Sequence, residues 1–427
     1  MTKQLITIMC AVALIVSACV ADLEPVSLPV VDYTSELRGM LSFDSTARRL
    51  LSGVYKRNEG TTRFGDRIAV AYDGQVVTMY TVRGVAFFTL RGGIANDSVK
   101  LVGVWRGVQG SETGIARLSI RPSEGGREIA EGKGNGLGLI LRGEITTSSG
   151  SRESYVIEKV DATNLRQLDF EIIAHRGGGR NSERLGVSEN SIPMVLLAGR
   201  LGATAVEVDI QRTRDGEPII FHDPTFTART VPSPYVIGDV DNYTLRQLKA
   251  VARLVNGETI PTLDEMLDVI IDSTELRLVW LDVKAPSVMD AILTSHARAV
   301  ERARQRGRDV DILIGIPDDA TFSAVRNSRL FGSLEIDPKT GTLPILCELG
   351  VDRVRDVNAR VWAPRFTAGL QSTLVAEMKK EKRRCFVWTV DDQNFISDFV
   401  SNGEFDGILT NYPTLLAAMF YTSPKGR

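Results

Sequence analysis

Two histidines that end short apolar segments are the residues of this chain best suited to acid and base chemistry. His175 follows Ile172-Ile173-Ala174, and His222 follows Ile219-Ile220-Phe221. Histidine titrates near neutral pH, so a pair can divide the general base and general acid roles. A single histidine at a strand end is more often structural, and we interpret His296, in a basic helical stretch, in that way.

Carboxylates lie on the segments between and after these histidines. Glu207 and Asp209 are separated by one residue of an otherwise apolar segment, so they point to the same face of a strand. Asp282 and Lys284 repeat that spacing further along the chain. Two buried carboxylates side by side are costly unless a cation neutralises them, and Mg or Ca is the natural partner. We therefore predict a divalent metal held by Glu207, Asp209 and Asp282.

The segments that position these residues alternate with amphipathic helices from about residue 165 onward. This alternation indicates parallel strands covered by helices, and a span of about 260 residues is typical of a TIM-type (β/α)8 barrel, whose strands end at the substrate-binding face. The nine candidate strands are 172–175, 205–209, 218–222, 277–283, 311–316, 343–347, 359–363, 385–390 and 407–410. The Asp215-Gly216 turn leaves no room for a helix between the second and third candidate strands. We therefore expect one of the nine strands to lie outside the ring.

The preceding part of the chain has a different pattern. Ala116, Leu118 and Ile120 alternate with polar residues, and glycine-containing turns separate such runs. We predict an all-β domain, an antiparallel sandwich or small barrel of roughly six to eight strands. The expected organisation is a signal peptide at 1–19, a tether at 20–45, a β-rich domain at 46–165 and the barrel at 166–427. The β-rich domain has no chemical cluster, which favours a packing or substrate-presenting role.

The first nineteen residues are typical of an export signal. Lys3 precedes an apolar stretch too short to span a bilayer, and Val16-Ser17-Ala18-Cys19 resembles the bacterial lipobox. That resemblance implies lipidation of Cys19 and a membrane anchor in the bacterial cell envelope. The residue that follows Cys19 is Val20 rather than Asp, which favours the outer membrane as the location of the anchored protein. A plain signal peptide with an incidental cysteine is the alternative.

Composition narrows the choice of partner. The formal net charge is -2, and Lys and Arg are spread along the chain, which argues against nucleic acid as a partner.

Cys347 and Cys385 remain in the mature part, and we interpret them as buried thiols in separate strands rather than as a disulfide.

Nine short motifs follow the order seen in the glycerophosphodiester phosphodiesterase family, which the chain resembles over about residues 170 to 420. They are His175-Arg176-Gly177, Glu189-Asn190, Glu207-Val208-Asp209, Thr213-Arg214-Asp215-Gly216, His222-Asp223, Ile260-Pro261-Thr262-Leu263, Asp282-Val283-Lys284, Trp388-Thr389-Val390 and Asp406-Gly407-Ile408-Leu409-Thr410. The resemblance implies a TIM-type barrel that hydrolyses glycerophosphodiesters to glycerol 3-phosphate and an alcohol with a divalent metal.

The resemblance also implies roles for matching residues. Glu207 and Asp209 match the family's metal carboxylates, and His175 and His222 match its acid and base, in an order that the sequence leaves open. Asp282 stands where the family usually has Glu, and Asn411 stands where Asp is more usual. The predicted substrate-binding residues are Arg176, Lys284, Glu189, Asn190 and Trp388, with a barrel-packing role for Trp388 as the alternative.

Two further readings stay open. A phospholipase D-like or phosphoinositide-type enzyme acting on intact phospholipid or lysophospholipid would suit a membrane anchor. The other is a lipoprotein that binds an envelope partner through its β-rich domain and has an inactive barrel.

The loop from Gly178 to Ser188 is long for the family, and its Arg180 and Arg184 are expected to shape the entrance to the site. We call residues 178–188 the entrance loop.

Overall fold

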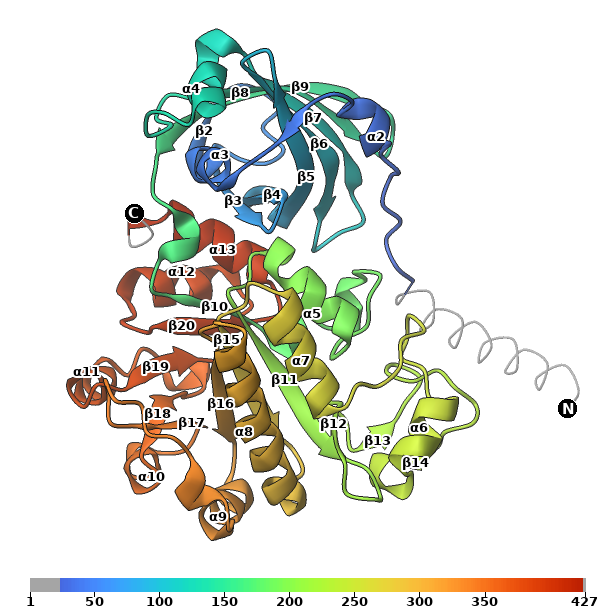
Figure 1. The fold of residues 1–427 in the computed structure, drawn as a ribbon, viewed down its shortest axis with the longest axis vertical. Coiled ribbons are helices and arrows are strands. Elements are labelled where there is room, and N and C mark those ends of the chain that lie inside the picture. Colours follow the sequence, from blue (N-terminus) through green and yellow to red (C-terminus); the bar gives the residue numbers. More distant parts are fainter. Residues whose placement is uncertain (1–23, 425–427) are drawn as a thin grey trace, which may run out of the picture.

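The computed structural model describes residues 24–424, which form two closed barrels, one on top of the other (Figure 1). The predicted signal peptide and Cys19 lie outside the described residues. Within the described part, no helix has both the length and the apolar character needed to span a membrane.

The N-terminal barrel is an up-and-down antiparallel ring. Its strands are β2 (Gly53–Gly60), β3 (Arg67–Asp73), β4 (Val76–Thr81), β5 (Ala86–Ala95), β6 (Ser98–Gly107), β7 (Thr113–Ile120), β8 (Ile140–Thr147) and β9 (Arg152–Asp161). Each strand pairs with the next, and β2 pairs with β9 to close the ring. The domain is therefore a barrel rather than a sandwich, and because the ring closes, β2 to β9 all have two neighbours.

Three short elements precede the ring: α2 (Tyr33–Glu36), β1 (Leu41–Ser42) and α3 (Ser45–Leu51). β1 pairs with β5, so residues that the sequence pattern assigns to the tether belong to the folded domain. The interior of the barrel is filled by apolar side chains, among them the contacting rings of Phe64, Phe88, Trp105 and Tyr155. α3 and α4 (Gly126–Glu131) contribute buried residues to the same core.

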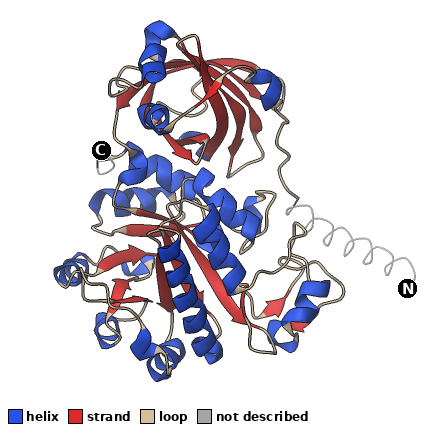
Figure 2. Cartoon of the chain, in the orientation of Figure 1, coloured by secondary structure: helices blue, strands red, loops and turns tan. Residues whose placement is uncertain are grey.

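The C-terminal domain is a closed eight-stranded parallel barrel with helices around it (Figure 2), as the sequence predicts. Its strands are β10 (Glu171–Ala174), β11 (Ala205–Arg212), β15 (Leu278–Val283), β16 (Asp311–Ile316), β17 (Leu343–Cys347), β18 (Ala359–Trp362), β19 (Arg384–Val387) and β20 (Gly407–Thr410). The pairing of β10 with both β11 and β20 closes the ring.

The outer helices are α5 (Ile192–Ala198), α7 (Leu263–Ser273), α8 (Met289–Gln305), α9 (Asp319–Asn327), α10 (Val351–Asp356), α11 (Ser372–Lys380), α12 (Gln393–Asn402) and α13 (Pro413–Thr422). The start of α7 follows the expected capping box, in which the Thr262 hydroxyl accepts from the Glu265 amide and the Glu265 carboxylate accepts from the Thr262 amide. Cys347 and Cys385 are buried free thiols, as expected.

The ninth candidate strand lies outside the ring. β12 (Pro218–Ile220) pairs antiparallel with the last residues of β11 after the turn at Gly216. An excursion follows it, formed by β13 (Thr225–Phe226), β14 (Gly238–Asp239) and α6 (Leu245–Val251), and it protrudes beside the barrel (Figure 1). His222 therefore does not end a barrel strand. It reaches the site because β12 runs back alongside β11.

The two barrels share a continuous apolar core. α13 is buried on nearly every side and contacts β3, β4 and β5 of the first barrel as well as β10 and α12 of the second (Figure 1). A helix that is apolar all round needs such cover on more than one face. Tyr80 of β4 is fully buried in this core, and its hydroxyl donates to the carbonyl of Gly199 at 3.2 Å. This contact joins the two domains into one packed unit.

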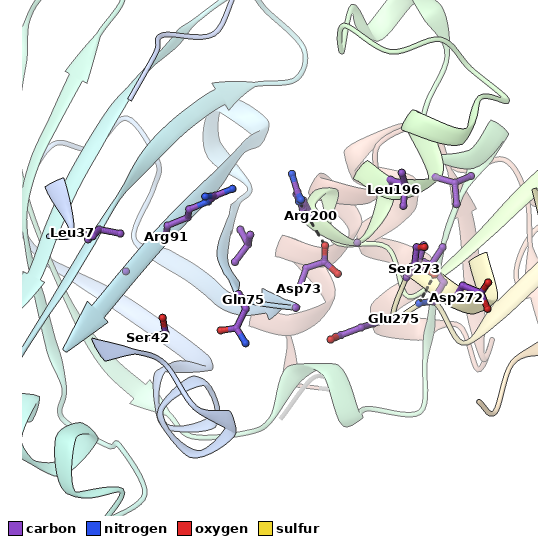
Figure 3. Close-up of a pocket in the computed structure, with 17 residues that line it drawn as sticks. Leu37, Ser42, Asp73, Gln75, Arg91, Leu196, Arg200, Asp272, Ser273 and Glu275 are labelled. Carbon is purple, nitrogen blue, oxygen red and sulfur yellow. Dashed lines mark hydrogen bonds and ion pairs between the residues drawn. The ribbon is translucent and has the colours of Figure 1, made fainter. Parts of the chain in front are cut away.

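A cavity of about 770 Å³ remains beside this interface (Figure 3). Gln75 and Arg91 line it from the first barrel, and Arg200 and Glu275 line it from the second. Asp73 and Arg200 point toward one another across the gap, with a closest approach of 3.8 Å. The lining is mixed in charge, and none of the predicted catalytic residues reaches it.

The shared core makes a prediction about stability. Tyr80→Ala removes a fully buried ring and should lower the free energy of unfolding by about 3–5 kcal/mol, whereas Tyr80→Phe removes only the hydroxyl and should cost about 1 kcal/mol. Urea unfolding followed by circular dichroism measures both. Equal loss in the two variants would contradict a packing role for the ring.

Candidate active site

The three predicted metal carboxylates meet at the carboxyl ends of β11 and β15. The parallel register places Asp209 directly beside Asp282, and Glu207 lies two residues earlier on the same face of β11. One carboxylate oxygen from each of the three lies within 4.8 Å of the others. Glu207 and Asp209 are at most 1% exposed, so water does not screen their charges.

Electrostatics at this cluster favour a bound cation. Burial raises the pKa of Glu207 well above its usual range, and Asp209 and Asp282 raise it further. Burial also raises the pKa of Asp282. Glu207 Oε1 and Asp282 Oδ1 are buried and make no hydrogen bond within the described chain. Unpaired buried oxygens of this kind are ligands that Mg²⁺ or Ca²⁺ prefers, so the residues fit the predicted metal.

Lys284 supplies part of the missing positive charge. Its ammonium donates to Asp282 and lies 3.3 Å from Asp209 Oδ1. Burial by itself would raise the pKa of Asp209, but Lys284 and the two histidines lower it below its usual value. One ammonium between three carboxylates leaves the cluster negative. Lys284 thus lies beside the carboxylates, and its predicted contact with substrate stays a prediction.

His175 is held in one tautomer. Its Nδ1 lies 2.8 Å from Asn411 Oδ1, and Asn411 Nδ2 donates to Asp391 at 2.6 Å. Because an ionised carboxylate only accepts, Asp391 fixes the orientation of the amide, and the Nδ1 of His175 must carry the proton. Nε2 is then the basic nitrogen, 3.8 Å from Glu207 Oε2. Burial lowers the pKa of His175 to about 4, so the ring is neutral at pH 7.

His222 has an anionic partner instead. Its Nδ1 lies 2.6 Å from Asp223 Oδ1, and the other oxygen of Asp223 accepts from Arg229 at 2.7 Å. Burial would raise the pKa of Asp223, but these two hydrogen bonds lower it, so Asp223 is ionised at neutral pH. His222 is near enough to the cluster to lower the pKa of both Asp209 and Asp282. Both histidines therefore act electrostatically on Asp209.

Three predicted substrate-binding residues form a buried network behind the carboxylates. The Arg176 amide donates to Glu207 Oε2 at 2.8 Å, and its guanidinium donates to Glu189 at 2.7 Å. Glu189 also accepts from Arg229, and Asn190 Nδ2 donates to Asp209 Oδ2 at 2.8 Å. These contacts orient the metal carboxylates. Direct contact of Arg176, Glu189 and Asn190 with substrate stays a prediction.

Trp388 lies at the end of β19 and packs against the apolar side chains inside the barrel. Its indole nitrogen donates to the Ala363 carbonyl at 2.8 Å, and the Arg365 guanidinium covers the ring at 4.5 Å from its centroid. The packing role left open by the sequence is therefore present, and a contact with glycerol stays a prediction. His296 is buried and bonds the Ile312 carbonyl, away from the carboxylates.

Sequence reasoning missed three acidic residues around the site. Asp391 and Glu348 each come soon after an apolar strand, which is the signal used for His175, but neither belongs to a motif considered above. Burial and Asp282 raise the pKa of Glu348 well above its usual range, which places it near the same cluster. Asp223 stands within the His222-Asp223 motif, but its role as partner of His222 emerges only from the geometry.

Comparisons with known proteins agree with this geometry. Residues 175–286 match the glycerophosphoryl diester phosphodiesterase family. The chain is 26% identical to the glycerophosphodiester phosphodiesterase of Caldanaerobacter subterraneus over 254 residues, which cover 57% of this chain and 95% of the relative. It is 28% identical to the probable glycerophosphodiester phosphodiesterase 2 of Mycobacterium tuberculosis over 261 residues, covering 57% and 88%.

Among solved structures, a putative glycerophosphoryl diester phosphodiesterase from Silicibacter pomeroyi superposes with a TM-score of 0.46 at 21% identity, covering 60% of this chain and 95% of that one. The matched sequence stretch contains His175, Glu207, Asp209, His222 and Asp282. The C-terminal barrel therefore carries a glycerophosphoryl diester phosphodiesterase family domain, matched over residues 175–286.

Proposed function

We propose that this protein hydrolyses glycerophosphodiesters to glycerol 3-phosphate and an alcohol, with a divalent metal and two histidines. The observation that carries the proposal is the meeting of Glu207, Asp209 and Asp282 within 4.8 Å, next to both histidines. The family match over residues 175–286 and the names of the two bacterial relatives support the same substrate class.

Glu207, Asp209 and Asp282 would hold the metal. A bound divalent ion polarises a phosphoryl oxygen and offsets negative charge in the transition state. Asp282 is one methylene shorter than the glutamate usual in the family, and its register beside Asp209 still brings it into the cluster. Both Mg and Ca suit an all-oxygen site, so both belong in any assay.

The partners of the histidines divide their roles in the proposal. His175 is neutral with its proton on Nδ1, so Nε2 accepts the proton of the substrate hydroxyl that attacks phosphorus, and water then opens the resulting cyclic phosphate. His222 is paired with the Asp223 carboxylate, which stabilises a positive imidazole, so it donates a proton to the departing alcohol oxygen. The sequence leaves this assignment open, and the difference between Asn411 and Asp223 supports it.

Lysophospholipid is the second candidate substrate. The hydrogen bonds that support it join the start of the described chain, at Glu24 and Val26, to Arg184 of the entrance loop, close to a predicted lipid anchor. Release of choline from soluble glycerophosphocholine and from lysophosphatidylcholine in vesicles, measured side by side, separates the two candidates.

Removal of either histidine should abolish most of the activity. We expect His175→Ala and His222→Ala to lower kcat on glycerophosphocholine by about 100- to 10,000-fold, since each loses one proton transfer. The matched control is His296→Gln, at the third mature histidine, which should stay within about threefold of the wild type. If either alanine variant keeps the wild-type rate while folded, the proposed catalysis is wrong, and the envelope-binding reading gains support.

Metal binding can be measured without an assay. Protein treated with EDTA should gain thermal stability when Mg²⁺ or Ca²⁺ is added, by about 2.7 kcal/mol at a concentration of one hundred times Kd. Glu207→Gln should remove this gain, because the cluster loses a ligand. Asp352→Asn, whose side chain is 94% exposed, should keep it. If neither ion changes the melting temperature of the wild-type protein, the metal assignment is wrong.

We also propose that the chain is exported and anchored to the bacterial envelope through Cys19. The supporting observation is the lipobox-like Val16-Ser17-Ala18-Cys19 after an apolar stretch. The protein should sediment with membranes when expressed with its own signal, and Cys19→Ser should move it to the soluble fraction. Membrane association that survives this substitution would argue for another mode of attachment.

A further inference from the structure

Arg106 of the N-terminal barrel is buried against the entrance loop of the catalytic domain. It lies near the end of β6, is only 2% exposed, and its guanidinium donates to the main-chain carbonyl of Glu183. Its Nε has no hydrogen-bond partner in the described chain, and burial, together with the nearby Arg184, lowers its pKa to about 10. Burial of a charged guanidinium costs free energy unless the group is paired, so we interpret the hydrogen bond to the Glu183 carbonyl as a specific contact between the two domains.

Arg184, the residue after Glu183 in the entrance loop, is bound by residues at the start of the described chain. The Val26 amide donates to the Arg184 carbonyl at 3.2 Å, and Arg184 Nε donates to the Glu24 carbonyl at 2.6 Å. Two consecutive loop residues, Glu183 and Arg184, are therefore tied to parts of the chain that precede the catalytic barrel.

Both ends of the entrance loop carry residues of the site. His175 and Arg176 come just before it, and Glu189 and Asn190 follow it. Inside the loop, the Asn181 amide donates to the Glu189 carboxylate and the Glu189 amide donates to the Asn181 side chain, each at 2.9 Å. A displacement of the loop is thus transmitted to the network around Arg176 and Glu189.

The relative from Caldanaerobacter is too short to carry this arrangement. The relative from Caldanaerobacter is covered over 95% of its length by 254 residues of alignment, so the remaining twentieth is too short for a barrel like β2 to β9. The contacts from Arg106 and from residues 24–26 are therefore features of this two-domain chain.

We propose that the N-terminal part of the chain is a clamp on the entrance loop and that Arg106 is a positioning residue for substrate binding. The expected effect on KM rests on the proposed hydrolase function, whereas the expected effect on the structure of the entrance loop does not. The metal carboxylates stand on β11 and β15, and His175 is fixed through Asn411, so release of the loop should weaken substrate binding more than it slows the chemical step.

The structural test is hydrogen exchange in the full chain. Arg106→Met keeps the apolar bulk of the side chain and removes the donor, and Arg117→Met makes the same change at an exposed β7 arginine that contacts Glu36. Mass spectrometry should show exchange in residues 178–188 at least tenfold faster in Arg106→Met and unchanged in Arg117→Met. Unchanged exchange in Arg106→Met would overturn the clamp.

The kinetic test uses the same variants with glycerophosphocholine. Arg106→Met should raise KM about tenfold and leave kcat within about threefold, whereas a general loss of folded protein would lower kcat and leave KM alone. Arg184→Ala breaks the second contact without emptying a buried site, and it should move exchange and KM in the same direction if Arg106→Met does not fold. Wild-type protein without activity would refute the proposed function, whereas the exchange result alone would still decide the clamp.

Discussion

Three carboxylates without enough positive charge are the constraint around which the catalytic domain is arranged. Glu207, Asp209 and Asp282 share one face of neighbouring strands, and Lys284 neutralises only part of their charge. The site around them supplies hydrogen bonds from the Arg176 amide and the Asn190 side chain. In the proposed function a divalent cation would complete this charge balance, held by the three carboxylates.

Much of the site could be predicted because it follows local rules. A Glu-x-Asp on an apolar strand defines a shared face, and strands that alternate with helices define a parallel barrel whose ends meet. What the sequence could not give are interactions between distant segments. His175 and Asn411 are 236 residues apart, and the Nδ1 proton of His175 is fixed only when Asp391 joins them. The Asp215-Gly216 turn predicts that one strand leaves the ring, but the antiparallel pairing of β12 with β11, which brings His222 to the site, is not part of the local pattern.

The N-terminal domain shows the same limit. Alternation predicts strands, but it does not distinguish a sandwich from a closed ring, since both bury one face of each strand. The contact of Arg106 with the entrance loop joins residues 77 positions apart and leaves no mark in the local pattern. A buried helix, α13, and the shared core then make the two barrels one packed unit. The N-terminal barrel is therefore placed to influence the catalytic site without contributing a reactive group.

The most direct measurement of the central claim is phosphorus NMR of glycerophosphocholine incubated with the purified protein, once with Mg²⁺ and once with Ca²⁺. We expect the diester resonance to be replaced by that of glycerol 3-phosphate, with release of choline, and this conversion to stop when EDTA is added. Formation of phosphocholine, or an unchanged diester with both metals, would contradict the assignment of this site as a glycerophosphodiester phosphodiesterase.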